Sequence, residues 1–586
     1  MLKWQNELAQ KLNIKISQIE STIGLLNDDK TIPFIARYRK EVTGSLDEIQ
    51  IREIADSLHF QEKLAERKEE ILTSLTNQEA LTDDLKKKIE NAETMKALED
   101  IYLPFKKKQK TRADIAVEKG LKPLAEFILK SRQRDDGFVS RFIDKEKGVN
   151  TIEEAMNGAM DIIAEEIAYD TEVRDFVREN LFRHGIIETK KNEKKEDEKA
   201  VYKNYYDNRF RVYSIPEWRV LAINRAENDK ILKVKMLVDW EKFNPYLERK
   251  TEYGDAKGFS IMQLVVFGVR KFHPYFTELT ETAIDAYKRL IFPSIEREIR
   301  NDLTEKAEKR SIEIFQNNLR HLMLTPPLKK IRIAGIDPGF RTGCKIAYID
   351  ENSNLLGYDT IYATPPHNKT KEAMEILTRA YKKHKFNLIS IGNGTASKET
   401  EEFISNWLDN IEDKDIKYII VSEAGASVYS ASPTAGEEFP ELDVTIRGAI
   451  SIGRRVQDML NELVKIPPES IGVGMYQHDI SVNLLKEKLS REVESVVNYV
   501  GVDINNASEY LLQYVSGFSK KTAKNLIEYR QNNGLFKTRN EIRKVKGIGD
   551  KVYELSAGFC RVPESANPLD NTIIHPESYK LTERVL

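Results

Sequence analysis

The sequence has little cysteine, no long apolar run and no excess of charge of either sign. Its two cysteines, Cys344 and Cys560, lie far apart and lack the spacing of zinc ligands. This excludes a zinc ribbon or a disulfide scaffold and indicates a reducing compartment. No stretch approaches the roughly 18 apolar residues of a membrane span, and the first residues lack an apolar core of signal-peptide length. We therefore expect a soluble, cytoplasmic protein with no membrane partner.

Positive charge is not in excess either. The 586 residues include 92 Lys and Arg against 94 Asp and Glu, a formal net charge of −2. This balance excludes a globally basic nucleic-acid-binding protein, so any such role must depend on local patches. The length exceeds what one hydrophobic core supports and predicts several domains.

The pattern of apolar residues changes along the chain. Up to about residue 330 the spacing is almost wholly helical, and strand-like runs are scarce, the clearest being 210–215, 219–223 and 231–238. Beyond that point short apolar runs alternate with helical ones, which predicts a mixed sheet flanked by helices. The expected strands are 331–336, 345–349, 355–361, 388–391 and 418–421, and the expected helices are 371–383 and 396–406. Short helices broken by glycines return after residue 467.

One carboxylate stands at the end of the first strand of this mixed part. The segment 330–350, KIRIAGIDPGFRTGCKIAYID, leads Asp337 into a Pro-Gly turn. RNase H-like nucleases of the RuvC type have their first metal-ligating carboxylate at such a place. Glu423, after the strand that ends near 422, and Asp443 or Asp458, on the next long helix, would complete a set around two Mg²⁺ ions.

Each of these acids also has an ordinary structural explanation. Asp337 can cap its own turn, Glu423 favours a helix N-terminus, and Asp443 is a good helix N-cap. Asp458 can pair with Arg454 four residues earlier. The order of the elements therefore predicts an RNase H-like fold, whereas metal catalysis at these residues stays open.

Two glycine hairpins lie near the C-terminal end of the sequence. Residues 511–530 read LLQYVSGFSKKTAKNLIEYR and residues 542–559 read IRKVKGIGDKVYELSAGF, each a helix-hairpin-helix pattern. Backbone N–H groups of such a hairpin point at a DNA or RNA phosphate, glycine permits the close approach, and lysines supply counter-charge. The candidate nucleic-acid-binding residues are Gly517, Lys520, Lys521, Lys524, Lys546, Gly547, Gly549 and Lys551. A purely structural pair of hairpins is the alternative.

Two N-terminal segments combine aromatic rings or lysines in ways that suggest either packing or binding. Phe34 and Tyr38 are four residues apart, so one helix face can bury both, and we favour a packed core seam over a nucleic-acid face. The run 105–112, FKKKQKTR, contains five cations after a proline. It is either a solvated loop or a loop that contacts phosphate.

Long stretches of the sequence resemble one bacterial family. TIPFIARYRKEVTGSLDEIQIRE, IAGIDPGFRTGCK, GNGTASKET, VSEAGASVYSAS and PELDVTIRGAISIGRRVQD are similar to the Tex family of transcription accessory proteins. The resemblance implies a multi-domain, mainly α protein. The implied parts are a helical N-terminal region with a helix-turn-helix-like element (1–190), a helical connecting region with short strands (191–328), a YqgF/RuvC-like RNase H-fold domain (329–465), a helix-hairpin-helix domain (466–565) and a C-terminal tail (566–586).

The resemblance also implies a function. It is that of a nucleic-acid-binding transcription accessory protein, a non-enzymatic scaffold that contacts RNA or DNA, works with the transcription machinery and requires no cofactor. The alternative is a metal-dependent RuvC-like nuclease using Asp337, Glu423 and Asp443, with Mg²⁺ held by Asp337 and Glu423. The YqgF domain of the family is regarded as a degenerate or unproven active site, which favours the scaffold. A third hypothesis is a protein-interaction module that touches nucleic acid little.

Tex proteins normally end in an OB-fold RNA-binding domain. No later run of glycine-punctuated strands follows the second hairpin, so we expect that domain to be absent and RNA affinity to be lower. The sequence predicts no oligomeric state.

Overall fold

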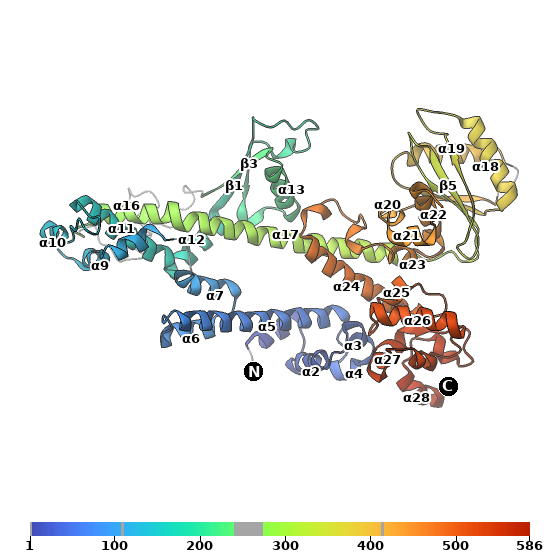
Figure 1. Ribbon diagram of the computed structural model, residues 1–586, viewed down its shortest axis with the longest axis horizontal. Helices are drawn as coiled ribbons and strands as arrows, with labels where there is room; N and C mark the ends of the chain where they lie inside the picture. Colours follow the sequence, from blue (N-terminus) through green and yellow to red (C-terminus); the bar gives the residue numbers. More distant parts are fainter. Residues whose placement is uncertain (1–2, 107–109, 239–272, 412–414, 586) are drawn as a thin grey trace. The chain divides into compact units, whose positions relative to one another are not determined.

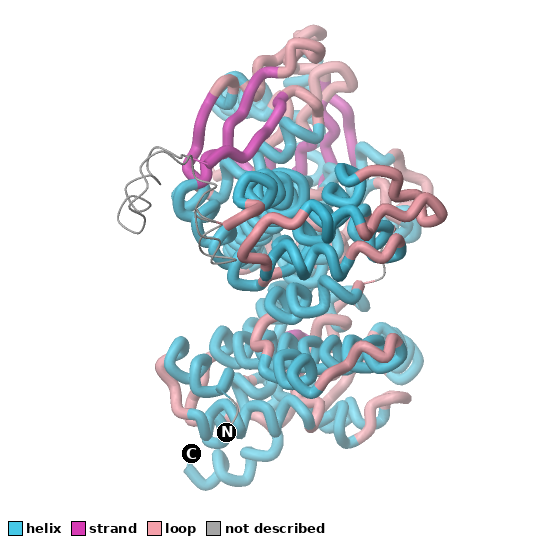
Figure 2. Tube along the Cα trace, turned by 90° about the vertical axis from the view of Figure 1, so that its left-hand side faces the viewer, coloured by secondary structure: helices cyan, strands magenta, loops and turns pink. Residues whose placement is uncertain are grey.

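The computed structural model describes residues 3–106, 110–238, 273–411 and 415–585, and most of them are helical (Figures 1 and 2). Two compact units form: residues 1–58 with 311–586, and residues 59–310. The boundaries fall within two long helices, α5 (Glu48–Asn77) and α17 (Phe292–Met323). Among the described residues, no helix is both long enough and apolar enough to cross a membrane. The mainly α fold that the sequence predicts is confirmed.

The unit of residues 59–310 is built of helices with one small sheet. Its sheet has the order β2-β1-β3, with both pairs antiparallel. The elements are α6 (Asp83–Asn91), α7 (Met95–Tyr102), α8 (Arg112–Glu118), α9 (Lys122–Lys130), α10 (Asp136–Ser140), α11 (Ile152–Tyr169), α12 (Thr171–His184), β1 (Gly185–Lys191), β2 (Asn208–Arg211), α13 (Glu217–Asn228), β3 (Leu232–Val238) and α16 (Phe276–Asp285). Part of the lysine-rich run at 105–112 (residues 107–109) lies outside the described residues.

The strand expected at 219–223 is wrong, because these residues belong to α13. Pro216 stands at the N-cap and Glu217 in the first turn, both of which are helix-start signals. A short apolar run such as RVLAI does not distinguish a strand from a buried helix by periodicity alone. The strand expected at 210–215 is shorter than predicted and gives way to a 3-10 turn at Val212–Ser214.

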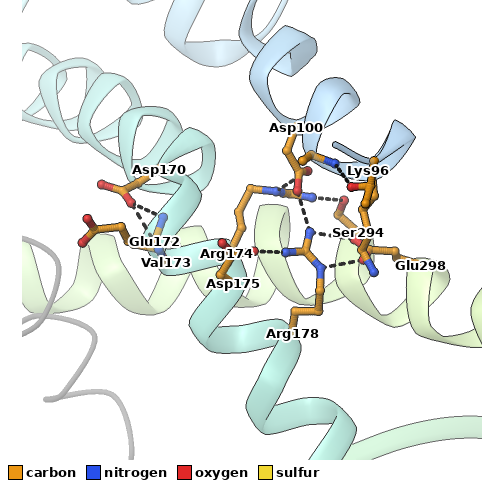
Figure 3. A network of polar contacts seen from close by, with 12 residues as sticks. Lys96, Asp100, Asp170, Glu172, Val173, Arg174, Asp175, Arg178, Ser294 and Glu298 are labelled. Atoms are coloured by element: carbon orange, nitrogen blue, oxygen red, sulfur yellow. Dashed lines mark hydrogen bonds and ion pairs between the residues drawn. The ribbon is translucent and has the colours of Figure 1, made fainter. Parts of the chain in front are cut away.

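A buried ion-pair network joins three helices of this unit (Figure 3). Arg174 on α12 has a side chain only 5% exposed, and its Nε lies 3.0 Å from Oδ1 of Asp100 on α7. Arg178 donates from Nη2 to Oδ2 of Asp100 at 2.6 Å and from Nε to Oε1 of Glu298, on α17, at 2.6 Å. Asp100 thus pairs with two guanidinium groups, and these charge-assisted hydrogen bonds compensate for the burial of its carboxylate.

In the other unit, the first helices pack on the last ones. The helices are α1 (Lys3–Leu12), α2 (Ile16–Asn27), α3 (Ile32–Tyr38) and α4 (Lys40–Thr43). Phe34 on α3 is fully buried, and the ring centroids of Tyr38 and Phe559 are 5.2 Å apart. Arg39 pairs with Glu554 at 2.9 Å. These contacts confirm the packed core seam expected at Phe34 and Tyr38.

The middle of this unit is an RNase H-like domain. Its five strands have the order β6-β5-β4-β7-β8, with β4, β5 and β6 antiparallel and β7 and β8 parallel to β4. The strands are β4 (Ile333–Asp337), β5 (Cys344–Ile349), β6 (Leu355–Ile361), β7 (Leu388–Gly392) and β8 (Lys417–Val421). All five match the strands expected from the sequence within about two residues, the uncertainty usual at element ends.

Helices cover both faces of this sheet (Figure 1). The helices α18 (Thr370–His384) and α19 (Ser397–Asp409) pack on one face, and α22 (Val444–Gln457) packs on the other against β4 and β5. Glycines allow the close approach of α22, because a Cβ at Gly335 would lie 2.8 Å from the backbone nitrogen of Gly453. The short helices α20 (Ala426–Ser430) and α21 (Pro433–Glu438) precede α22.

The C-terminal part is a compact set of short helices on one longer helix. Its elements are α23 (Met459–Leu463), α24 (Val482–Val500), β9 (Val502–Asp503), α25 (Glu509–Leu512), α26 (Lys520–Asn533), α27 (Asp550–Ser556), β10 (Cys560–Arg561) and α28 (Tyr579–Val585). Strands β9 and β10 pair in parallel. Buried Leu489, Val493 and Val496 of α24 belong to the same apolar core as α26 and α27.

Candidate nucleic-acid interface and the acidic pair

The two glycine hairpins have the same backbone turn. Gly517 and Gly547 both have positive φ, +81° and +90°, which side chains rarely tolerate. In each hairpin the amide after this glycine donates back across the turn. Phe518 N lies 2.9 Å from Val515 O, and Ile548 N lies 3.1 Å from Val545 O. The sequence repeat is therefore also a structural repeat.

The first hairpin is partly buried by other residues of its unit. Ser516 is only 1% exposed, and its amide donates to Oδ1 of Asn498 at 2.9 Å. A Cβ at Gly517 would lie 2.7 Å from Cβ of Leu555, so this glycine is required for packing. A capping box between Ser519 and Thr522 satisfies the start of α26.

The second hairpin is open. Lys546, Gly547 and Gly549 are exposed, and in the described chain their amides have no hydrogen-bond partner. Gly549 is the N-cap of α27 and offers no side-chain cap. No atom lies within 4 Å of the place of a Cβ there. The hairpin is held from behind by Asn525, whose Nδ2 donates to Lys546 O at 2.7 Å. Backbone donors that face solvent in a positive-φ turn are suited to an anion such as phosphate.

The predicted lysines surround these hairpins on the surface. In the described part of the chain, Lys520, Lys521 and Lys546 have no carboxylate within ion-pair distance. Lys524 lies 4.0 Å from Glu528 and Lys551 lies 2.9 Å from Asp29, and all four side chains are exposed. Exposed pairs of this kind contribute little, so these lysines stay available to an incoming phosphate.

Two residues that contribute to the second hairpin were not predicted from the sequence. Arg543 stacks on the ring of Tyr553 at 3.9 Å and pairs with Asp550, the first residue of α27. It thereby offsets a negative charge that would repel a phosphate at this helix. Because Arg543 lies beside other cations in the sequence, its contribution to this hairpin could have been predicted. The role of Asn525 could not be predicted from the sequence, because its contact with Lys546 forms only in the folded chain.

The acids of the RNase H-like domain form a pair, Asp337 and Glu423. Asp337 ends β4, and burial raises its pKa to about 6, assisted by the charge of Glu423 and opposed by Lys345. The Glu423 carboxylate lies against the turn after β7, where a Cβ at Gly392 would be 2.8 Å from its Oε2. A Cβ at Gly394 would overlap the same carboxylate. The two acids thus lie near each other, each packed closely against glycine backbone.

The third predicted acid is engaged elsewhere. Asp443 is the N-cap of α22, where its Oδ1 accepts from the amide of Thr445 at 2.9 Å and from the hydroxyl at 2.6 Å. These bonds hold the pKa of Asp443 below its usual range. Asp458, the other candidate, is the N-cap of α23 and accepts from Asn461 N at 3.0 Å.

The residue of α22 that faces Asp337 is Gly448, whose Cβ, if present, would lie 2.8 Å from Oδ2 of Asp337. Over the described ranges, no group of three His, Cys, Asp or Glu residues is placed to hold a metal ion. The residues present therefore do not fit the two-Mg²⁺ arrangement of a RuvC-like nuclease, and we derive no reaction from it. The catalytic assignment of Asp337, Glu423 and Asp443 stays a prediction.

Comparison with known sequences gives the same domain order. The matching families are the Tex-like protein N-terminal domain (residues 2–76), the Tex central region (131–315) and the Tex protein YqgF-like domain (331–457). They are followed by a helix-hairpin-helix motif (497–561) and an HHH domain (567–586).

Named relatives match along almost the whole chain. Protein tex of Bordetella pertussis and the transcriptional accessory protein Tex of Neisseria gonorrhoeae are each 39% identical over 99% of this chain. The alignments cover 73% and 74% of those proteins. The human S1 RNA-binding domain-containing protein 1 is 35% identical over 99% of this chain and 63% of its own length.

The fold and the hairpins together define a multi-domain protein with a YqgF-like RNase H fold and helix-hairpin-helix nucleic-acid-binding motifs. The chain belongs to the Tex family of transcriptional accessory proteins. The resemblance noted in the sequence is confirmed.

Proposed function

We propose that this protein binds the backbone of DNA or RNA chiefly through its second hairpin, Lys546–Gly549, and acts as a non-enzymatic scaffold. The observation that carries the proposal is the exposed hairpin at Gly547 and Gly549, with no side-chain cap, beside Lys520, Lys521 and Lys546, which pair with no carboxylate of the described residues. Contacts of this kind hold phosphates and read no sequence. We further infer that the scaffold works with the transcription machinery in the cytoplasm. The name of the Neisseria relative, transcriptional accessory protein Tex, supports the link to transcription.

The direct test is Gly549→Ala. The fold has room for this methyl group, because nothing lies within 4 Å of the Cβ position and the φ is an ordinary −83°. The same methyl group would stand where a phosphate must approach the amides. We expect a several-fold loss of affinity for a 20-base-pair duplex, measured by fluorescence anisotropy, with an unchanged melting temperature.

Gly472→Ala is the matched control, since that glycine also has nothing within 4 Å of its Cβ position. The proposal fails if Gly549→Ala binds duplex as the parent chain does, or if Gly472→Ala is equally impaired. Contact with the transcription machinery has its own test. RNA polymerase should co-purify with the tagged chain even after nuclease treatment of the lysate. If the treatment removes the polymerase, the two proteins were joined only through nucleic acid, and direct contact is contradicted.

A further inference from the structure

An aromatic and cationic surface lies on the small sheet of residues 59–310, in the unit that does not contain the hairpins. It consists of Phe210 and Arg211 at the end of β2, Tyr213 in the following 3-10 turn, and Trp218 and Arg219 at the start of α13. Trp218 is 48% exposed and Tyr213 is 51% exposed. Among the described strands, β2 is at the edge of its sheet, and this surface borders it. We refer to these five residues as the Trp218 face.

Its cations are arranged around the rings. The guanidinium of Arg219 lies 4.8 Å from the ring centroid of Phe210 and 4.9 Å from that of Trp218. Nη1 of Arg211 donates to Oη of Tyr213 at 3.1 Å. Each exposed ring therefore has an arginine beside it, which fixes the orientation of both partners.

The positive charge of Arg219 is not compensated by a neighbouring acid. No carboxylate lies within ion-pair distance of it over the described residues. The nearest acids in the sequence and across the sheet are already used. Glu217 pairs with Lys306 at 3.2 Å, and Glu188 pairs with Arg209 at 2.8 Å. The Trp218 face thus combines half-exposed aromatic rings with the charge of Arg219, which no acid of the described residues offsets.

This combination fits one class of ligand. Single-stranded nucleic acid presents unstacked bases that pack on aromatic rings, and phosphates that arginine binds in a bidentate manner. A duplex hides its base faces, and a purely apolar protein partner would leave the charge of Arg219 unpaired. We propose that the Trp218 face is a second nucleic-acid site, in which bases of a single strand stack on Trp218 and Tyr213 while Arg211 and Arg219 hold the flanking phosphates. It is a base-stacking site for single strands and is separate from the phosphate-binding hairpin proposed above.

The test compares two labelled probes, a 15-nucleotide oligo(dT) and the corresponding oligo(U), with a 20-base-pair duplex, using the full chain at one fixed ionic strength. We expect Trp218→Ala to weaken binding of both single strands by about 5- to 150-fold, the loss typical of one stacked base, and to leave duplex affinity unchanged. Unequal losses for oligo(dT) and oligo(U) would identify the preferred strand. Tyr358→Ala, an aromatic of 53% exposure on β6, is the matched control and should change neither.

Tryptophan fluorescence gives a second readout, which can be measured on the parent chain and does not depend on a loss of affinity in a variant. A base stacked on Trp218 quenches its emission, so oligo(dT) should quench the parent chain and Trp4→Phe, whereas Trp218→Phe should lose the quenching. Single-strand affinity that is unchanged in Trp218→Ala overturns the proposal, and this includes the case in which the face binds a protein. If Gly549→Ala alone impairs binding, the hairpin proposal stands and this one falls. If only the Trp218 variants impair binding, the proposal for the Trp218 face stands and the hairpin proposal falls. A parent chain that binds none of the probes overturns both proposals.

Discussion

The carboxylate of Asp337 packs against the backbone of Gly448. A Cβ on Gly448 would lie 2.8 Å from Oδ2 of Asp337, so the helix α22 offers no side chain at the place that faces this acid. The carboxylate of Asp443, just before this helix, caps the helix N-terminus. Asp337 is left half-buried beside one other acid, Glu423, and its pKa is raised chiefly by burial and further by the charge of Glu423.

We predict that Asp337→Asn stabilises the protein at pH 8 and has little effect near pH 4. The pKa of Asp337 is raised in the fold to about 6, so the folded state holds this proton more tightly than the unfolded chain does. Stability is then present below the unfolded pKa and is lost as the pH rises through 6. The gain at pH 8 is at most about 3 kcal/mol, measured by thermal denaturation across pH. An equal gain at pH 4 would contradict this cause.

Asp443→Ala is the control of opposite sign. Hydrogen bonds from Thr445 hold the pKa of Asp443 below its usual range, so its contribution is present at neutral pH and is lost as the pH falls. Removal of this N-cap should lower the melting temperature at pH 8 and lower it less at pH 3.

We predict that Mg²⁺ and Mn²⁺ at millimolar concentration neither raise the melting temperature nor support cleavage of branched or single-stranded DNA and RNA. A third carboxylate is lacking on α22 opposite Asp337, because that residue is Gly448. The measurements are a metal titration followed by thermal denaturation and a gel assay of labelled substrates. Metal-dependent cleavage that is abolished by Asp337→Asn in a folded chain would establish the nuclease alternative instead.

Gly335→Ala should severely destabilise the RNase H-like domain. The added Cβ would lie 2.8 Å from the nitrogen and 2.9 Å from the Cα of Gly453, and these backbone atoms cannot move without displacing α22 from β4. We expect a loss of about 3 kcal/mol or more in urea denaturation. Gly472→Ala has open space at the same atom and should be neutral.

The network around Asp100 predicts a strong cost for removing one charge. Arg174 and Asp100 have side chains only 5% and 15% exposed, so Arg174→Met leaves a buried carboxylate with one guanidinium partner fewer. We expect about 3 to 5 kcal/mol of destabilisation for this single variant and a smaller cost for Arg174→Met combined with Asp100→Leu. Additive costs in urea denaturation would show that the two side chains are not coupled.

The sequence predicted the RNase H-like sheet well because its strands are short, fully buried apolar runs between turn residues, as at 333–337 and 388–392. It failed at 219–223, where local composition is equally compatible with helix. It also identified the ordinary explanation for Asp443 correctly, since N-capping is a local property.

The parts of the site that the sequence could not predict depend on tertiary contacts. The two hairpins read alike, yet Ser516 is covered by Asn498 and Thr31 from other helices, whereas Lys546 is exposed. Nothing near Gly448 in the sequence indicates that it faces Asp337. The Trp218 face was likewise hidden, because Phe210 and Arg219 meet only when β2 and α13 are brought together.

The packing of Tyr38 and Arg39 on the last helices has a consequence for synthesis of the chain. Arg39 bonds to Glu554 and Glu577, 515 and 538 residues later, and the hydroxyl of Tyr38 donates to Ile573 O, 535 residues later. At the usual rate of about 5–20 residues per second, a ribosome needs tens of seconds to produce these partners after α3 emerges. During that interval the side of α3 that carries Phe34 and Tyr38 has no native surface to cover it, whereas Ile35 already packs on the neighbouring N-terminal helices. The nascent chain should therefore depend on chaperones strongly at its beginning.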